Sequence, residues 1–447
     1  MRALQDYSWP WVQEQVAQTI DIWHQVARSS GLGGPRYSLK EQLAREKAYD
    51  HALRAVEREV SEPPRNQLER LQSKDRITAS FARFSATALG LEDEAIRLLT
   101  DEFLPMGTAV ARWARQFDAT LSMTDIVQAC RNAWTVGGLQ PLLGDSTGIT
   151  PSILGYSLLY PYSDNYLDRP DVTPREKLGF SERFRLRLRG EELFPLDALE
   201  ASTWTMVKLI EDEYPREAYP QVFACLLAIH RAQEESIAQL NCDARCADPE
   251  ILRITCAKGG CSVLADACLA HGSLTGKESL FSFQWGALLQ LGDDLQDVRE
   301  DMLRGSVTLF SRAAASGKPL DALLTQLLAF SEFVGAQMDD LPSGTSELKD
   351  LLRMSWRSLI VGAVAKSQNF FSSGFLQDVE RLSPFRFKFL RKRQERLAGR
   401  QGLYPALFDA FVEAPEDNPA ELPSPYSPKE PGFRAEPEPV AALTLMG

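Results

Sequence analysis

The sequence predicts an all-α protein, and three observations lead to this prediction. Nearly every segment before the C-terminal tail repeats its apolar residues every three or four positions, the spacing of one helix face. No run of β-branched residues alternates with polar ones, as a half-buried strand would require. Hydrophobic residues make up 44% of the 447 residues, which is enough for a sizeable core.

The helices can be placed in order along the chain. The first is expected around Trp11–Trp23, ending near Gly31–Gly34. A charge-rich, helix-prone segment follows over 39–60, and Pro63 and Pro64 stop it. Further helices are expected at about 66–89, 92–118, 123–136, 149–163, 174–190, 196–212, 215–240, 248–272, 276–303, 306–316, 318–340, 346–371 and 374–411.

Composition divides the chain into three parts. Residues 1–75 are interpreted as an N-terminal helical extension, and residues 76–412 as the main helical domain. Residues 413–447 are rich in Pro and Glu and cannot bury enough apolar surface to offset their chain entropy. We therefore expect a disordered tail.

Charge and cysteine usage narrow the function classes. A formal net charge of −12 disfavours nucleic acid as a partner, because a polyanion would be repelled. The seven cysteines lie mostly in helix-like apolar patterns, which indicates buried free thiols in a reducing compartment. Cys242 and Cys246 have CxxxC spacing without a second Cys/His pair, so a zinc site is not expected.

The sequence contains no signal-peptide pattern and no run of 18 apolar residues. We therefore expect a cytoplasmic protein without a transmembrane segment. The four histidines form no HExxH motif or triad-like grouping, so ordinary structural roles are expected for them.

The segment 281–305 carries a row of acids inside an apolar helix pattern. The row consists of Gln290, Asp293 or Asp294, Asp297, and Glu300 or Asp301. Steps of three and four residues place these side chains on one helix face, where like charges repel. A hard divalent cation would neutralise them, and Mg²⁺ typically takes one or two carboxylates plus phosphate oxygens. The alternative is a solvated acidic face, which the flanking apolar residues disfavour.

A second acid pair, Asp164 and Asp168, lies about 130 residues upstream with i,i+4 spacing. Pro161 is expected to kink the preceding helix or end it just before the acids. The alternative is a helix cap at Ser163 or Asp164 with exposed acids. Two acid rows that end apolar helices could face each other across a bundle, and two or three Mg²⁺ ions between them would hold a diphosphate.

These motifs resemble those of the class I isoprenoid synthases. Gln290–Asp297 resembles the second aspartate-rich motif of trans-prenyltransferases, and Asp297–Gly305 is similar to the DVxEDxxRG stretch of phytoene synthases. Asp164–Asp168 resembles the first motif of the squalene and phytoene synthases and of bacterial large terpene synthases. The resemblance covers residues 90–400. It implies antiparallel helices around a deep apolar pocket, with a metal cluster at its mouth.

The chain departs from the family at three points. Asn165 interrupts the full DDxxD of the prenyltransferases, and the NSE-type motif of terpene cyclases is absent. The tyrosine-rich segment of phytoene synthases is also absent, and Cys256–Cys261 occupies roughly that region. The subfamily therefore stays open.

The resemblance implies a specific site. Its catalytic residues would be Asp164, Asp168, Asp293 and Asp297; the same four, with Asp294 and Asp301, would bind Mg²⁺, with Mn²⁺ as an alternative ion. The diphosphate would be bound by Lys258, Arg304 and Gln290. For Lys258, which precedes Gly259 and Gly260, a surface position near a tight helix crossing is an equal alternative.

Other residues could assist ionisation. Arg183, Arg185, Arg187 and Arg189, or the basic run 386–396, could bind phosphate, although solvated or paired side chains are the favoured interpretation. Tyr156, Tyr160, Trp204, Phe281 and Trp285 are candidates for the wall that stabilises a carbocation, with core packing as the alternative role.

The favoured function is a Mg²⁺-dependent enzyme that ionises an allylic isoprenyl diphosphate, and a terpene synthase rather than a trans- or head-to-head prenyltransferase. The alternative of another class is a non-catalytic helical scaffold. An all-α phosphohydrolase of the HD type is a weaker hypothesis, because histidines are scarce. A homodimer is left open.

Overall fold

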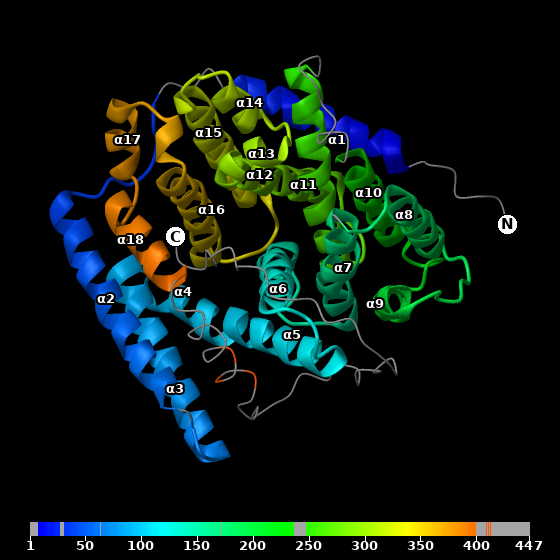
Figure 1. The fold of residues 1–447 in the computed structure, drawn as a ribbon, viewed down its shortest axis with the longest axis horizontal. Coiled ribbons are helices and arrows are strands. Elements are labelled where there is room, and N and C mark those ends of the chain that lie inside the picture. The colour runs from blue at the N-terminus through cyan, green and yellow to red at the C-terminus, as the bar shows by residue number, and fades with distance from the viewer. Residues whose placement is uncertain are drawn as a thin grey trace.

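The computed structural model describes residues 8–26, 31–62, 64–169, 171–236 and 247–398, with the single positions 408, 410 and 412. It does not describe the side chains at positions 8, 9, 164, 168, 397 and 398. Within this part of the chain every regular element is a helix, so the all-α prediction is confirmed (Figure 1). The predicted tail at 413–447 and the CxxxC pair, Cys242 and Cys246, lie outside the described residues.

The helices follow one another with short connections. In chain order they are α1 (Ser8–Val26), α2 (Leu39–Ser61), α3 (Gln67–Phe84), α4 (Asp93–Arg97), α5 (Leu104–Phe117), α6 (Met123–Leu143), α7 (Pro151–Asp168), α8 (Pro174–Leu188), α9 (Ala198–Glu213), α10 (Pro220–Ser236), α11 (Asp248–His271), α12 (Gly276–Gln296), α13 (Val298–Arg304), α14 (Leu309–Ala315), α15 (Asp321–Gln337), α16 (Ser346–Lys366), α17 (Ser373–Glu380) and α18 (Phe387–Ala398). Two π-helical turns, Ser85–Leu89 and Leu98–Phe103, extend α3 and precede α5.

Helix α11 lies at the centre and packs against α6, α10 and α12. The closest crossing is between α11 and α12, where a Cβ atom at Gly259 would overlap the carbonyl oxygen of Gly286. A Cβ atom at Gly260 would likewise overlap the ring of Phe283. The expected close backbone approach at these glycines is therefore confirmed, and it holds two antiparallel helices together beside the cavity described below.

The N-terminal helices divide between two apolar clusters. Val12, Val16 and Trp23 of α1 belong to the main core. Helices α2 and α3 instead form a second cluster around Tyr49 and Phe84, along one edge of the molecule beside α18 (Figure 1). The expected boundary at residue 75 falls inside α3.

Two of the helix limits that differ from those expected involve prolines. α7 runs through Pro161 to Asp168, so the expectation that the proline ends this helix is wrong. Packing against α6 and α9 supports the helix past the missing backbone hydrogen bond. The segment expected as one helix over 374–411 is two helices, α17 and α18, because Pro384 disfavours the helical backbone at Ser383.

No helix in the described ranges combines the length and apolar character that a membrane span needs.

Candidate active site

A cavity of about 1480 Å³ opens between α5, α6, α7, α11, α12 and α16, and its lining extends to α8 and α10 and to α2, α3 and α18. It is larger than the roughly 300–1,000 Å³ of most small-molecule sites. Its wall is largely apolar and includes the aromatic side chains of Trp134, Tyr156, Tyr160, Trp285 and Trp356. Of the aromatic candidates, Tyr156, Tyr160 and Trp285 line the cavity, whereas Trp204 and Phe281 are buried in the core. The space suits a long apolar ligand.

The acid row of α12 lies at one end of this cavity. Asp293 and Asp297 line it, and the side chain of Asp293 is 51% exposed. Asp294 points away from the cavity and is only 6% exposed. The hydroxyl of Thr255 on α11 donates to Asp294 Oδ2, and Gln290 Nε2 donates to Oδ1, both at 3.0 Å. The structure thus separates a cavity-facing acid from a neighbour that ties α12 to α11.

The row does not lie on a single straight helix. α12 ends at Gln296, and Asp297 has φ −98° and ψ 10° before α13 begins. Backbone hydrogen bonds still run from Asp297 N to the Asp293 carbonyl at 2.9 Å, and from Asp301 N to the Asp297 carbonyl at 2.8 Å. The prediction of one shared face is therefore accurate only as far as Asp297, where the helix breaks beside the cavity.

Burial raises the pKa of each aspartate in the row. For Asp293 and Asp297 burial is the main cause, and repulsion from a neighbouring carboxylate adds to it. Burial raises the pKa of Asp294 to about 6, although its two hydrogen bonds oppose this shift. Burial, with repulsion from Asp294 and Asp297, raises the pKa of Asp301 to about 7. The fold holds these acids close together, and a cation bound among them would relieve the repulsion.

Three basic side chains from three helices face the acid row. Arg131 of α6 approaches Asp293, with Nη2 4.0 Å from Oδ1. Lys366 ends α16 and lines the cavity; burial lowers its pKa, whereas the nearby Asp297 raises it. Lys258 of α11 also lines the cavity and acts electrostatically on Asp293 and Asp294. This end of the cavity therefore combines carboxylates and cations, as a site for a phosphate–metal complex requires.

Sequence reasoning selected Lys258 but missed Arg131 and Lys366. A signal for Arg131 existed, since Arg131 and Asn132 interrupt an apolar helix between Cys130 and Ala133. Lys366 is less visible, because a cation at the last turn of a helix is common for electrostatic reasons alone. Only the packing of α16 against α12 places Lys366 at the acid row.

The first acid motif is placed only by its backbone. Positions 164 and 168 are helical within α7, but the side chains of Asp164 and Asp168 lie outside the described residues. Their neighbours Tyr160, Ser163 and Leu167 line the cavity. The cap interpretation is wrong, because Thr150 caps α7 and the Ser163 hydroxyl donates within the helix to the Leu159 carbonyl at 2.8 Å.

Of the other two predicted phosphate ligands, Gln290 lines the cavity and Arg304 lies on the surface. Gln290 lines the cavity, although its amide nitrogen is used by Asp294. Arg304 lies at the end of α13, where it is 72% exposed and pairs with Glu300 at 2.6 Å. In this arrangement Arg304 is outside the cavity lining, whereas Arg131 and Lys366 are part of it.

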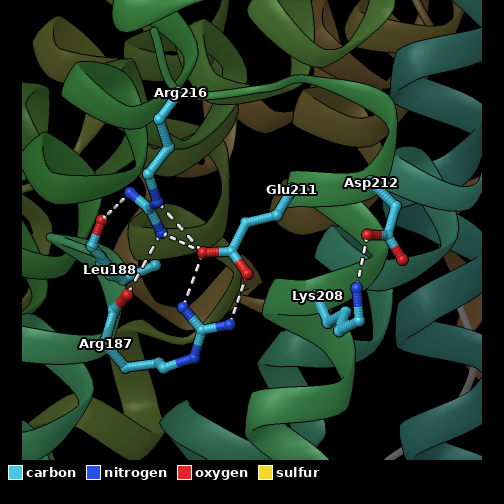
Figure 2. Close-up of polar contacts among 6 residues, drawn as sticks. All are labelled: Arg187, Leu188, Lys208, Glu211, Asp212 and Arg216. Carbon is cyan, nitrogen blue, oxygen red and sulfur yellow. Dashed lines mark hydrogen bonds and ion pairs between the residues drawn. The ribbon is translucent and has the colours of Figure 1, made fainter. Parts of the chain in front are cut away.

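Arginines of α8 form ion pairs with acids of α9 and of α8 itself. Arg183 donates to Glu200 at 2.6 Å, and Arg185 pairs with Glu182. Figure 2 shows the densest group, in which Glu211 accepts from both Arg187 and Arg216. The expectation of paired side chains is therefore confirmed for Arg183, Arg185 and Arg187.

The basic run 386–396 is also occupied by ion pairs. Its side chains pair with acids of α2: Arg386 with Glu46 at 2.6 Å, Arg393 with Asp50 at 2.7 Å, and Arg396 with Glu57 at 3.4 Å. These contacts join α18 to the N-terminal helices.

The described cysteines are buried free thiols, as expected. They are Cys130, Cys225, Cys256, Cys261 and Cys268. Burial raises the pKa of the Cys130 thiol to about 12, so a thiolate is disfavoured there.

Whether a divalent ion fits can be judged from the described donors. No three His, Cys, Asp or Glu side chains in the described ranges are grouped as a ready-made metal site. Asp293 and Asp297 nevertheless offer two carboxylates to the cavity, and desolvation together with a neighbouring carboxylate raises the pKa of each. Mg²⁺ usually takes one or two carboxylates and completes its shell with waters and phosphate oxygens. The residues present fit such an ion.

The sequence matches no model of a known protein family and no curated protein.

Proposed function

We propose that this protein is a Mg²⁺-dependent class I isoprenoid enzyme that ionises an allylic isoprenyl diphosphate, and within that class a terpene synthase. The observation that carries the proposal is the polarity of the cavity. Asp293, Asp297, Arg131, Lys258 and Lys366 gather at one end, and mostly aromatic and aliphatic side chains line the rest. A ligand with a charged head and a long apolar tail matches this distribution.

The head of the ligand would lie against the acid row. Asp293 and Asp297, with Asp164 and Asp168 from the resemblance, would hold Mg²⁺, which would neutralise the diphosphate as it leaves. Arg131, Lys258 and Lys366 would contact the diphosphate oxygens directly, and their fixed positive charge stabilises the negative charge that develops on the leaving group.

The tail of the ligand would occupy the apolar part. When the allylic carbon–oxygen bond breaks, its electron pair leaves with the diphosphate, and the carbon skeleton becomes a cation. Trp285, Tyr156 and Trp134 present aromatic side chains to the cavity, and aromatic faces attract a cation. The apolar wall also excludes water, which would otherwise trap the cation as an alcohol.

The direct test is turnover by the purified protein. Protein, Mg²⁺ and C10–C20 isoprenyl diphosphates are incubated together, and diphosphate release and hydrocarbon products are measured. We expect release that depends on Mg²⁺ and hydrocarbon products without chain elongation. Elongated products on adding isopentenyl diphosphate would instead indicate a prenyltransferase, and no turnover of any of these substrates by folded protein would support the non-catalytic scaffold.

A further inference from the structure

Part of the cavity wall is polar although it lies away from the acid row. Asp266 of α11 and Asn132 of α6 both line the cavity. Asp266 is eight residues beyond Lys258 on the same helix, which places it roughly 12 Å farther along the axis at 1.5 Å per residue. The proposed chemistry at the diphosphate does not use this pair.

The hydrogen bonds of the pair fix its orientation. Asn132 Nδ2 donates to Asp266 Oδ1 at 3.0 Å and to the Ser157 hydroxyl at 3.1 Å. Both amide hydrogens of Asn132 are then used, and the side chains of α6, α7 and α11 are joined. In the described part of the chain no further hydrogen bond is made by Asp266 Oδ2 or Asn132 Oδ1.

The surroundings of Asp266 favour the neutral form of its carboxyl group. Its residue is 1% exposed, and burial raises its pKa well above the usual value, although Asn132 opposes the shift. A protonated carboxyl group is a hydrogen-bond donor through its O–H, and an amide oxygen is an acceptor. In its neutral form the pair offers one donor and one acceptor to the cavity.

We propose that Asp266 and Asn132 form a subsite for a hydroxyl group, so that the preferred ligand is an isoprenyl diphosphate carrying a hydroxyl far from its phosphate end. A hydroxyl both accepts and donates a hydrogen bond, and it matches the two unused positions of the pair. An unsubstituted tail would leave both groups desolvated without a partner, which disfavours it. This inference rests on the proposed function, since it takes the diphosphate end to lie at Lys258.

The test compares two ligands that differ only in one hydroxyl. Both are isoprenyl thiodiphosphates, which ionise poorly and so report binding without turnover; one carries a hydroxyl on its terminal isoprene unit. Affinities are measured by titration calorimetry in Mg²⁺ for the wild type and for Asp266→Leu, Asp266→Asn and Ser157→Ala. Circular dichroism checks that each variant is folded.

We expect the wild type to bind the hydroxylated ligand about tenfold more tightly, because one well-formed buried hydrogen-bond pair is worth about 1.4 kcal/mol. Asp266→Leu should abolish this preference while binding the unsubstituted ligand at least as well. Asp266→Asn retains a donor and should keep part of the preference, as should Ser157→Ala, which removes only the second partner of Asn132.

Equal wild-type affinities for the two ligands would overturn the inference and leave the proposed function intact. An equal loss of both affinities in Asp266→Leu would also overturn it, and would assign Asp266 to holding the helices together. Failure of the folded wild type to bind either ligand would overturn the proposed function, and the inference with it.

Discussion

Two charged regions of this protein shift the pKa of their carboxyl groups in opposite directions. In the α8–α9 region, burial raises the pKa of Glu211, but hydrogen bonds from Arg187 and Arg216 outweigh it, and the pKa is lowered overall. At the end of the cavity, burial raises the pKa of Asp293 and Asp297, and the approach of Arg131 does not offset it. The fold therefore favours the ionised form of Glu211 and disfavours the ionised forms of Asp293 and Asp297.

The comparison indicates that ionised Glu211 stabilises the fold, whereas ionised Asp293 and Asp297 destabilise it. Glu211 receives two arginines and fixes the connection between α8 and α9 (Figure 2). Asp293 and Asp297 reduce stability in their ionised form, because each loses part of its hydration at the cavity end and lies near another carboxylate. Ionisable groups that lower the stability of the fold and face a cavity are candidates for functional residues.

The largest expected effect concerns catalysis at the cavity end. Replacing Asp297→Asn removes a charge that the proposed mechanism uses for the metal, so diphosphate release should fall by about 100-fold or more. Stability should be unchanged or improved, since a repulsive charge is lost. Initial rates with the preferred isoprenyl diphosphate measure the first effect, and thermal unfolding in the absence of metal measures the second.

Asp212→Asn is the matched control. Asp212 is an exposed carboxylate on α9 that pairs with Lys208 at 2.5 Å, outside the cavity (Figure 2). Its replacement should leave diphosphate release unchanged. If Asp297→Asn retained the wild-type rate, Asp297 would have no metal-binding role in turnover.

The next prediction concerns the ion pairs of Glu211 with Arg187 and Arg216. Glu211→Gln should lower the free energy of unfolding at pH 7 by about 2 kcal/mol, because the partly buried Arg187 and Arg216 would lose the negative charge and one of their two acceptor oxygens. Because the folded pKa of Glu211 is lowered, its contribution is present above about pH 4.5 and is lost as the pH falls below that value. Denaturant unfolding at pH 7 and pH 3 measures both.

The rate of diphosphate release by Glu211→Gln should stay within about twofold of wild type, since this side chain lies outside the cavity lining. A variant as stable as wild type at pH 7 would mean that the arginines find other acceptors, and the contrast between the two regions would weaken.

The sequence is a better guide to the helices than to their mutual placement. Apolar periodicity suffices for the all-α class, and the acid spacing in 290–301 suffices to find one wall of the site. Periodicity could not predict that α7 continues past Pro161, because tertiary packing decides this. Nor could it show that Arg131 and Lys366 meet Asp293 and Asp297, since three separate helices bring these residues together.

Adjacent residues illustrate the same limit. Asp293 and Asp294 are equivalent by spacing alone, and sequence reasoning left open which one joins the acid row. The position of Thr255 on α11 decides that Asp294 is tied to the protein, so Asp293 is the one that faces the cavity.

A smaller effect is expected at Asp294, where the pH dependence of stability is opposite to that at Glu211. Because burial raises its folded pKa to about 6, the stability it contributes is full below about pH 4 and is lost as the pH rises through 6. Asp294→Asn should therefore unfold like wild type at pH 4 but be more stable at pH 8 by on the order of 1–2 kcal/mol. Denaturant unfolding with a chelator present measures this difference. Equal stability of the two proteins at both pH values would show that the ionised Asp294 is well accommodated.

The smallest expected effect is stabilisation of the fold by a cation that relieves the repulsion between the carboxylates of the acid row. Mg²⁺ competes with protons for Asp293 and Asp297, whose pKa values are raised by burial, so it should stabilise the fold more at pH 8 than at pH 5. At tenfold excess over its dissociation constant the gain is about 1.4 kcal/mol, seen as a higher melting temperature. Asp297→Asn should reduce this gain and Asp212→Asn should not. An equal gain in all three proteins would place the ion elsewhere, because neither substitution would then have removed a ligand of the ion.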